Sequence, residues 1–239
     1  MSAHGHNWWE VLGALFKAVP FLRIMLIGPP GTGKSTTAVL EGKGAKRDVY
    51  RITLTEGAGI EDLLGMYHLV DGETKWVDGP AVRALKTGSL LLLDEIDRHS
   101  PEVMSLLYAL LDDDPQVTLP SGEEVTAAKG YGVIATSNNA VSALPDAILD
   151  RFEAVLIANK PHPDAMKHLS QAAQAAVRNY YASVSLTTWK WKANPTLRRM
   201  RAFQKFSPHH DEAVIAGAVF GESGAEILSV LVTAGLGKE

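Results

Sequence analysis

The segment Gly28–Ser35 reads GPPGTGKS, and it constrains the fold of this chain more than any other feature. It fits the pattern G-x-x-x-x-G-K-[ST], a loop whose backbone N–H groups surround nucleotide phosphates. Phe21–Ile27 precedes the loop with the composition of a β-strand, and Thr36–Leu40 can continue as a helix. Free N–H groups and the helix dipole would both point at a bound anion in such an arrangement. The segment therefore predicts an α/β fold that binds a nucleotide.

Composition excludes several classes of protein. The chain of 239 residues has no cysteine, which rules out disulfides, thiolate metal sites and a cysteine nucleophile. Its formal net charge of −4 gives no general attraction to nucleic acid or to anionic membranes. The N-terminus lacks the charge and apolar pattern of a signal peptide, and Lys17 and Arg23 interrupt the longest early apolar stretch. We expect a cytoplasmic protein with no membrane insertion.

Strand and helix signals divide the chain near Pro161. Before it, apolar runs with strand composition alternate with helical patterns, which predicts a parallel sheet. After it, only helical patterns follow, so we expect an α/β core over residues 1–160 and an all-helical domain over residues 161–239. The expected strands are Val49–Thr55, Leu90–Leu93, Tyr131–Thr136 and Glu153–Ala158; the expected C-terminal helices are Pro163–Tyr181, Thr196–Phe206, His210–Phe220 and Gly224–Ala234.

Two stretches within the core carry hairpin signals. Met66–Gly79 places Asp71-Gly72 between two apolar segments, and Gln116–Ala127 turns at Pro120-Ser121-Gly122. Trp76 and Tyr67 in the first hairpin either grip a substrate or hold the hairpin against the core.

A pair of carboxylates follows a run of leucines in Ser89–Asp97, which reads SLLLLDEID. Asp94 and Glu95 then lie at the C-terminal edge of a central strand, where open α/β sheets bind ligands. Asp94 suits the carboxylate that orients Mg²⁺ and its waters, and Glu95 can polarise the attacking water. The alternative is an ordinary solvated acidic turn. The phosphate-loop motif upstream favours the interpretation as part of a nucleotide site.

The motifs GPPGTGKS, LLLLDEID, ATSN and DAILDRF occur in the order found in the AAA+ superfamily. Within it, EDLLG, VDGPAVRAL and LPDAILDRF make the chain similar to the MoxR-like, dynein-related branch. The resemblance covers Phe21 to Pro161 and, more loosely, the helical tail. It implies a three-layer αβα sandwich of the P-loop NTPase type, two β-hairpin insertions and a C-terminal helical lid domain.

The same resemblance implies roles for individual residues. Asn138 corresponds to the first sensor, with Asn139 as the alternative, and Arg151 to an arginine finger acting on a neighbouring subunit. Arg198 corresponds to the second sensor better than Arg199, and Thr53 or Thr55 could restrain Glu95. The residues expected to bind the phosphates of ATP are Gly28, Pro29, Pro30, Gly31, Thr32, Gly33, Lys34, Ser35 and Thr36, and those expected to hold Mg²⁺ are Ser35 and Asp94.

We therefore expect Mg²⁺-dependent ATP hydrolysis by a homo-oligomeric ring, hexameric by resemblance, which remodels or activates a protein partner. Such relatives commonly work with a separate chain that carries a von Willebrand A domain. ATP is favoured over GTP by the family alone.

Two other classes of function stay open. The segment Trp189–Phe206 interleaves basic and aromatic residues, which suits single-stranded nucleic acid. That pattern would fit a DNA-transaction protein such as a helicase loader or a replication or packaging factor, although a lid helix explains it more simply. The other alternative is a nucleotide-gated scaffold that does not hydrolyse its nucleotide. Such a scaffold would not need the full set of Asp94, Glu95, Asn138 and Arg151.

Overall fold

The computed structural model describes residues 7–18, 22–139, 144–183, 196–209, 211–220 and 223–233. Contacts within the chain divide it into two compact units. The first holds Lys34–Ile157 and the residues up to Ile27; the second holds Gly28–Gly33 and the residues from Ala158 onward. A domain boundary between residues 160 and 161 stays a prediction.

A five-stranded parallel sheet forms the centre of the first unit. Its strands lie in the order β2-β5-β8-β1-β9, so β2 is an edge strand and β5 has a neighbour on each side. The side chains of β1, β5 and β8 are buried along their whole length, as expected of strands covered on both faces. The predicted α/β class with a parallel sheet is confirmed. The strands are β1 (Arg23–Ile27), β2 (Val49–Thr53), β5 (Leu90–Asp94), β8 (Gly132–Ser137) and β9 (Ala154–Ile157).

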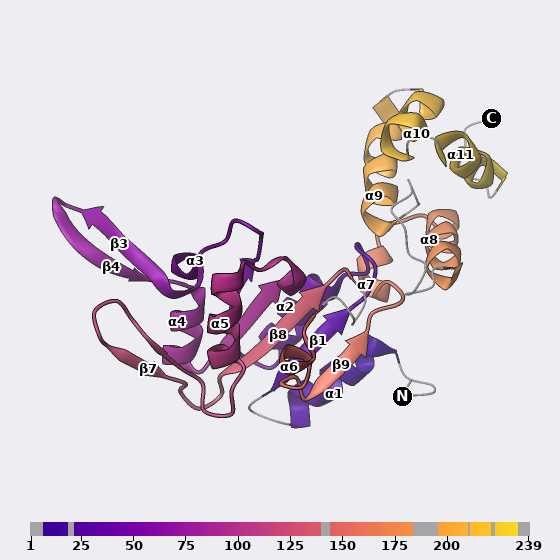
Figure 1. The fold of residues 1–239 in the computed structure, drawn as a ribbon. Helices are drawn as coiled ribbons and strands as arrows, with labels where there is room; N and C mark the ends of the chain where they lie inside the picture. Colours follow the sequence, from indigo (N-terminus) through magenta and orange to yellow (C-terminus); the bar gives the residue numbers. More distant parts are fainter. Residues whose placement is uncertain are drawn as a thin grey trace. The chain divides into compact units, whose positions relative to one another are not determined.

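Helices cover both faces of this sheet (Figure 1). Successive residues of a strand point to opposite faces, so Met25 and Ile27 of β1 join one apolar cluster with side chains of α3, α4 and α5. Helices α1 and α2 contact each other and strands of the sheet, which makes the third layer. The helical segments of the unit are α1 (Trp8–Ala18), α2 (Lys34–Gly44), α3 (Ile60–Leu64), α4 (Pro80–Thr87), η1 (Ile96–Arg98), α5 (Pro101–Leu110) and α6 (Asp146–Leu149).

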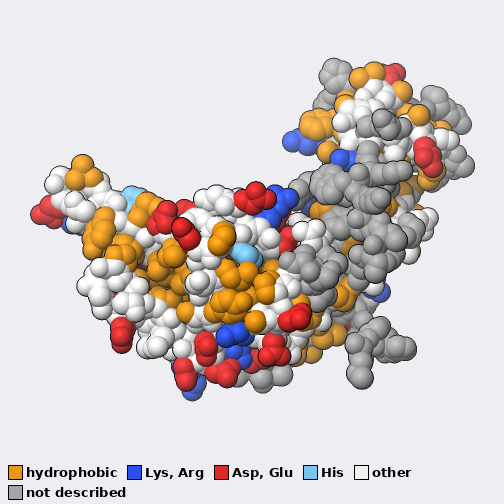
Figure 2. Space-filling view, in the orientation of Figure 1, with side chains coloured by type: hydrophobic (Ala, Val, Ile, Leu, Met, Phe, Trp, Pro, Cys, Tyr) orange, Lys and Arg blue, Asp and Glu red, His pale blue; other side chains and the backbone are white. Residues whose placement is uncertain are grey.

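Both predicted hairpins are present as separate two-stranded sheets: β3 (Gly65–Val70) with β4 (Glu73–Asp78), and β6 (Gln116–Thr118) with β7 (Glu124–Thr126). Asp71 and Gly72 turn the first hairpin with φ values of 53° and 80°, the positive values that a tight hairpin turn requires. This hairpin extends away from the sheet (Figure 1), and hydrophobic side chains lie on its surface (Figure 2). Leu69 is 77% exposed, whereas Trp76 is half-buried and packs on the core. Only part of the hairpin therefore packs against the rest of the first unit.

The second unit is built from helices. Buried side chains such as Val177, Met200, Phe203 and Phe220 form its own apolar cluster. One helix was expected over Pro163–Tyr181, but two are found, because the chain breaks around Ser170, whose hydroxyl caps the second helix by accepting from Ala173 N at 3.3 Å. The elements are α7 (Pro163–Met166), α8 (Gln171–Ser183), α9 (Leu197–Phe206), η3 (Ser207–His209), α10 (Glu212–Phe220) and α11 (Gly224–Thr233).

Candidate nucleotide-binding site

The glycine-rich loop joins β1 to α2 and is shaped by its glycines. Gly31 and Gly33 have φ values of 80° and 93°, in the left-handed region that side chains with a Cβ avoid. The Thr32 hydroxyl donates to Pro29 O at 3.1 Å and closes the loop on itself. Tyr181 Oη donates to Pro30 O at 2.7 Å, so a helix of the second unit also holds the loop. Helix α2 begins at Lys34, directly after the loop.

Asp94 ends β5 and is buried, with its side chain 4% exposed. Its Oδ1 accepts from Ser35 Oγ at 2.5 Å and from Thr136 Oγ1 at 2.9 Å, while Oδ2 accepts from Arg51 Nε. The two residues predicted to hold Mg²⁺, Ser35 and Asp94, are thus in direct contact although they are 59 positions apart in the sequence.

A line of hydrogen bonds connects Lys34, Asn138 and Glu95. Lys34 Nζ donates to Asn138 Oδ1 at 2.9 Å, and Asn138 Nδ2 donates to Glu95 Oε1 at 3.3 Å. Lys34 is 6% exposed, so its ammonium group lies at the base of the site rather than in solvent. Three residues predicted from separate motifs are therefore brought together by the parallel order of β1, β5 and β8.

Glu95 leaves the strand in an unusual conformation. Its φ of 56° and ψ of 47° are left-handed, and its backbone N–H donates to Thr136 Oγ1 at 3.2 Å. Left-handed conformations of residues other than glycine are uncommon and occur where the surroundings hold them in place. The Glu95 carboxylate also pairs with Arg98 Nε at 3.2 Å. Asp94 and Glu95 are thus each paired with an exposed arginine.

Arg151 lies outside this cluster. Its Nη1 donates to Ala147 O at 2.7 Å, and its guanidinium group lies 4.8 Å from the centre of the Tyr108 ring. These contacts hold the predicted arginine finger against its own chain.

The remaining predicted residues have varied positions. Asn139 donates to Asp97 Oδ2 at 2.5 Å, away from Lys34. Thr53 and Thr55 are exposed, and within the described part of the chain neither is hydrogen-bonded to Glu95. Arg198 belongs to α9, but its side chain lies outside the described residues, as does Trp189 in the basic aromatic segment.

Sequence reasoning did not include Arg51, Arg98, Thr136 and Tyr108. Arg98 could have been found, because it stands three positions after Glu95 and a short helical turn brings such residues together. Arg51 could also have been found, because it lies on the same face of its strand as Thr53, two positions later. Thr53 was already expected to lie near Glu95. Thr136 stands within the quoted ATSN motif, whereas no sequence signal relates Tyr108 to Arg151.

A model of the AAA domain of the dynein-related subfamily matches residues 23–152. The chain belongs to this family. The match runs from the start of β1 to three residues beyond α6 and includes Lys34, both carboxylates, Asn138 and Arg151. Membership implies nucleotide binding and ATPase activity for this AAA domain.

Curated relatives match a little over half of this chain. Protein NorQ of Paracoccus denitrificans is 32% identical over 139 residues, which cover 56% of this chain and 52% of NorQ. An uncharacterized protein of Staphylococcus saprophyticus is 33% identical over 143 residues, covering 56% of this chain and 54% of that protein. The chain thus spans about half the length of the curated relatives it matches.

Solved structures share the fold at low sequence identity. An ATPase candidate from Cytophaga hutchinsonii matches 74% of this chain and 51% of its own, with a TM-score of 0.51 and 22% identity. A single-residue variant of Thermotoga maritima RuvB matches 94% of this chain and 66% of its own, with a TM-score of 0.50 and 13% identity. These structures confirm the predicted P-loop NTPase fold. Over the residues described, the AAA protein contains no helix long and apolar enough to cross a bilayer.

Proposed function

We propose that this AAA protein hydrolyses ATP with Mg²⁺ in a homo-oligomeric ring and uses the cycle to remodel or activate a protein partner. The observation that carries the proposal is the line from Lys34 through Asn138 to Glu95, with Ser35 and Asp94 beside it. A residue that binds phosphate, a sensor and a candidate general base are thereby already in hydrogen-bond contact.

The donor set fits Mg²⁺. The cation prefers oxygen ligands and is usually held by one or two protein groups together with substrate phosphates. Ser35 offers a hydroxyl and Asp94 a carboxylate, and the two are 2.5 Å apart. Ser35 would bind the ion, Asp94 would orient its waters, and the ion would neutralise charge on the phosphates. The backbone N–H groups of Gly28–Gly33 and the ammonium group of Lys34 would bind the phosphate oxygens.

Glu95 is the candidate base. It would take a proton from the attacking water, because its carboxylate lies at the sheet edge next to the sensor amide. Asn138 would orient both the water and the terminal phosphate. The left-handed backbone of Glu95 and its bond to Thr136 aim the carboxylate before substrate binds.

Arg151 would act between subunits. An arginine finger stabilises the charge of the transition state and raises turnover by about 10³–10⁵ in GTPases. Arg151 contacts Tyr108 and Ala147 of its own chain, so it would have to leave them to reach a neighbour's nucleotide. A separate chain with a von Willebrand A domain is the proposed partner, and the exposed β3–β4 hairpin is the proposed contact for it.

The test is turnover per subunit against protein concentration, with light scattering on the same samples. We expect turnover to rise as rings form, to fall by about 10²–10⁴ for Glu95→Gln, and to fall by about 10³ for Arg151→Ala. Glu95→Gln should still bind ATP, whereas Lys34→Ala should lose binding. Turnover independent of concentration would contradict the ring, and absence of turnover with intact binding would favour the scaffold. Parallel assays with GTP in place of ATP decide which of the two nucleotides is the substrate.

A further inference from the structure

Among the described residues, Arg51 is the one charged side chain that donates to Asp94. Among the described residues three side chains donate to this carboxylate: two neutral hydroxyls, from Ser35 and Thr136, both bond Oδ1, and the guanidinium group of Arg51 bonds Oδ2. The phosphate-loop pattern accounts for Ser35, but nothing in the sequence motifs calls for a cation here.

The position of Arg51 is set by the sheet. It lies on the edge strand β2, and β2 pairs with β5 so that Arg51 stands opposite Leu92 and Thr53 opposite Asp94. Two residues along a strand span about 6.6 Å, which an arginine side chain can cover. The side chain therefore runs along the edge of the sheet to reach the carboxylate, and it is 53% exposed while that of Asp94 is 4% exposed.

Asp94 does not need Arg51 to be oriented. Ser35 from α2 and Thr136 from β8 hold Oδ1 from two elements, and the main-chain carbonyl of Asp94 accepts from Leu54 N at 2.8 Å. What Arg51 adds is a positive charge. It neutralises the carboxylate that a divalent cation would use.

We propose that Arg51 competes with Mg²⁺ for Asp94 and thereby sets how much Mg²⁺ the nucleotide site requires. The inference rests on the proposed function and assigns a new role within the same site. Like charges at a few ångströms repel, and a carboxylate already paired with a cation attracts a second one less strongly. Because the Arg51 side chain is 53% exposed, water can solvate the guanidinium group when it leaves Asp94, so Mg²⁺ can displace it.

If Arg51 competes with Mg²⁺, removing its charge should lower the Mg²⁺ requirement of the site. Removing the charge with Arg51→Gln should lower the Mg²⁺ concentration for half-maximal nucleotide binding by about tenfold, which corresponds to about 1.4 kcal/mol. Arg51→Lys keeps the charge and should stay within about threefold of wild type, since the effect is one of charge. A residue that only positioned Asp94 would have the opposite effect, because its loss would weaken the site for the metal.

The experiment titrates Mg²⁺ against binding of a fluorescent ADP analogue, with the affinity in EDTA measured beside it. Arg51→Gln should shift the Mg²⁺ midpoint and leave the affinity in EDTA within about twofold, because the effect requires the ion. Arg83→Gln is the matched control: Arg83 is also exposed, but its Nε donates to Asp78 O at 2.7 Å, outside the site. An unchanged or raised midpoint for Arg51→Gln overturns the inference. Thermal unfolding of each variant verifies that it is folded.

A second measurement separates this inference from the proposed function. Binding of Mn²⁺ to the nucleotide-free protein, followed by loss of the free-ion signal in electron paramagnetic resonance, should be tighter for Arg51→Gln than for wild type. If wild type fails to bind the ADP analogue, the proposed function fails, while the Mn²⁺ comparison still decides the role of Arg51. Equal Mn²⁺ affinity in the two proteins overturns that role.

Discussion

The side-chain amide of Asn138 faces a cation on one side and a carboxylate on the other. Its oxygen accepts from Lys34 Nζ and its nitrogen donates to Glu95 Oε1. An amide is the one group of this size that can accept and donate in this way, because a carboxylate near neutral pH only accepts. The chemical identity of residue 138 is therefore restricted more tightly than its size.

Asn138→Asp tests this restriction. Aspartate keeps the contact to Lys34 but places a second negative charge against Glu95 and removes the donor. We expect turnover at saturating ATP to fall by about 10²-fold, the order seen when one aligned donor is lost. ATP affinity, measured with a fluorescent analogue, should change by less than about threefold, because Lys34 keeps its partner.

The comparison variant is Asn139→Ala, since Asn139 is the alternative sensor and bonds Asp97 instead. Turnover that is lost in Asn139→Ala and kept in Asn138→Asp would contradict the assignment of Asn138.

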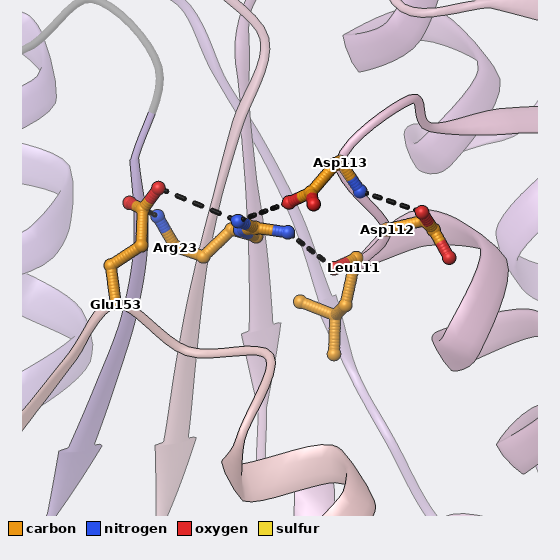
Figure 3. Close-up of polar contacts among 5 residues, drawn as sticks. All are labelled: Arg23, Leu111, Asp112, Asp113 and Glu153. Atoms are coloured by element: carbon orange, nitrogen blue, oxygen red, sulfur yellow. Dashed lines mark hydrogen bonds and ion pairs between the residues drawn. The ribbon is translucent and has the colours of Figure 1, made fainter.

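At the scale of elements, the C-terminal end of α5 is held by the side chains of Arg23, in β1, and of Tyr131, the residue before β8. The last carbonyls of a helix have no partner within it. Leu111 O accepts from Arg23 Nη1 at 2.7 Å, and Leu110 O accepts from Tyr131 Oη at 3.2 Å. Figure 3 shows Arg23 lying between Leu111, Asp113 and Glu153. Its Nη2 donates to Asp113 Oδ1 at 2.8 Å and to Glu153 Oε1 at 3.5 Å. Helix α5 is thereby tied to the start of β1 and to the residue before β8.

Tyr131 makes this junction sensitive to alkaline pH. Burial raises the pKa of Tyr131 far above its ordinary value, because the phenolate would lie in the core. In the unfolded chain the phenol ionises near pH 10, so the folded state holds more protons above that pH. Stability from this group is complete below about pH 10 and is lost as pH rises, by up to about 1.4 kcal/mol per unit.

Tyr131→Phe should remove this term. Below about pH 9 we expect the variant to be less stable by about 1 kcal/mol, because the hydrogen bond to Leu110 is gone. Above about pH 10 the difference should shrink and then reverse as the wild type loses stability. Urea unfolding curves recorded at a series of pH values measure both effects. A difference that stays constant up to about pH 11 would contradict the burial argument.

At the scale of the whole molecule, the proposed ring would complete the site at an interface between subunits. Arg151 supplies nothing to Glu95 of its own chain in the described contacts, and it is held by Tyr108 and Ala147. In a ring with head-to-tail interfaces, each nucleotide would lie between the Glu95 of one subunit and the Arg151 of the next.

Mixing two inactive variants tests this arrangement. A Glu95→Gln subunit keeps Arg151, and an Arg151→Ala subunit keeps Glu95, so roughly a quarter of the interfaces in a random equimolar ring would be complete. We expect the mixture to regain turnover that neither variant shows alone. A mixture of Glu95→Gln with Lys34→Ala is the control, since both changes damage the subunit's own nucleotide site. No recovery in the first mixture would mean that Arg151 does not act between subunits.

Local sequence patterns predicted much of the fold because each pattern reflects one helix, strand or turn. The phosphate loop, the leucine run before Asp94 and the Asp71-Gly72 turn each depend on neighbours in the chain, and each has its expected structure. The prediction of one continuous helix over Pro163–Tyr181 was wrong, because apolar spacing alone does not show that Ser170 caps a new helix.

By itself, the sequence determined that this protein has a phosphate loop, a carboxylate pair at a strand end and two hairpins. Only the tertiary structure decided which side chains meet there: Arg51 lies 43 positions from Asp94, and Asn138 lies 104 positions from Lys34. Parallel strands are joined by long crossovers, so residues that share a sheet edge come from distant segments. The order β2-β5-β8-β1-β9 brings an arginine from the edge strand to the buried carboxylate, and no local periodicity encodes that order.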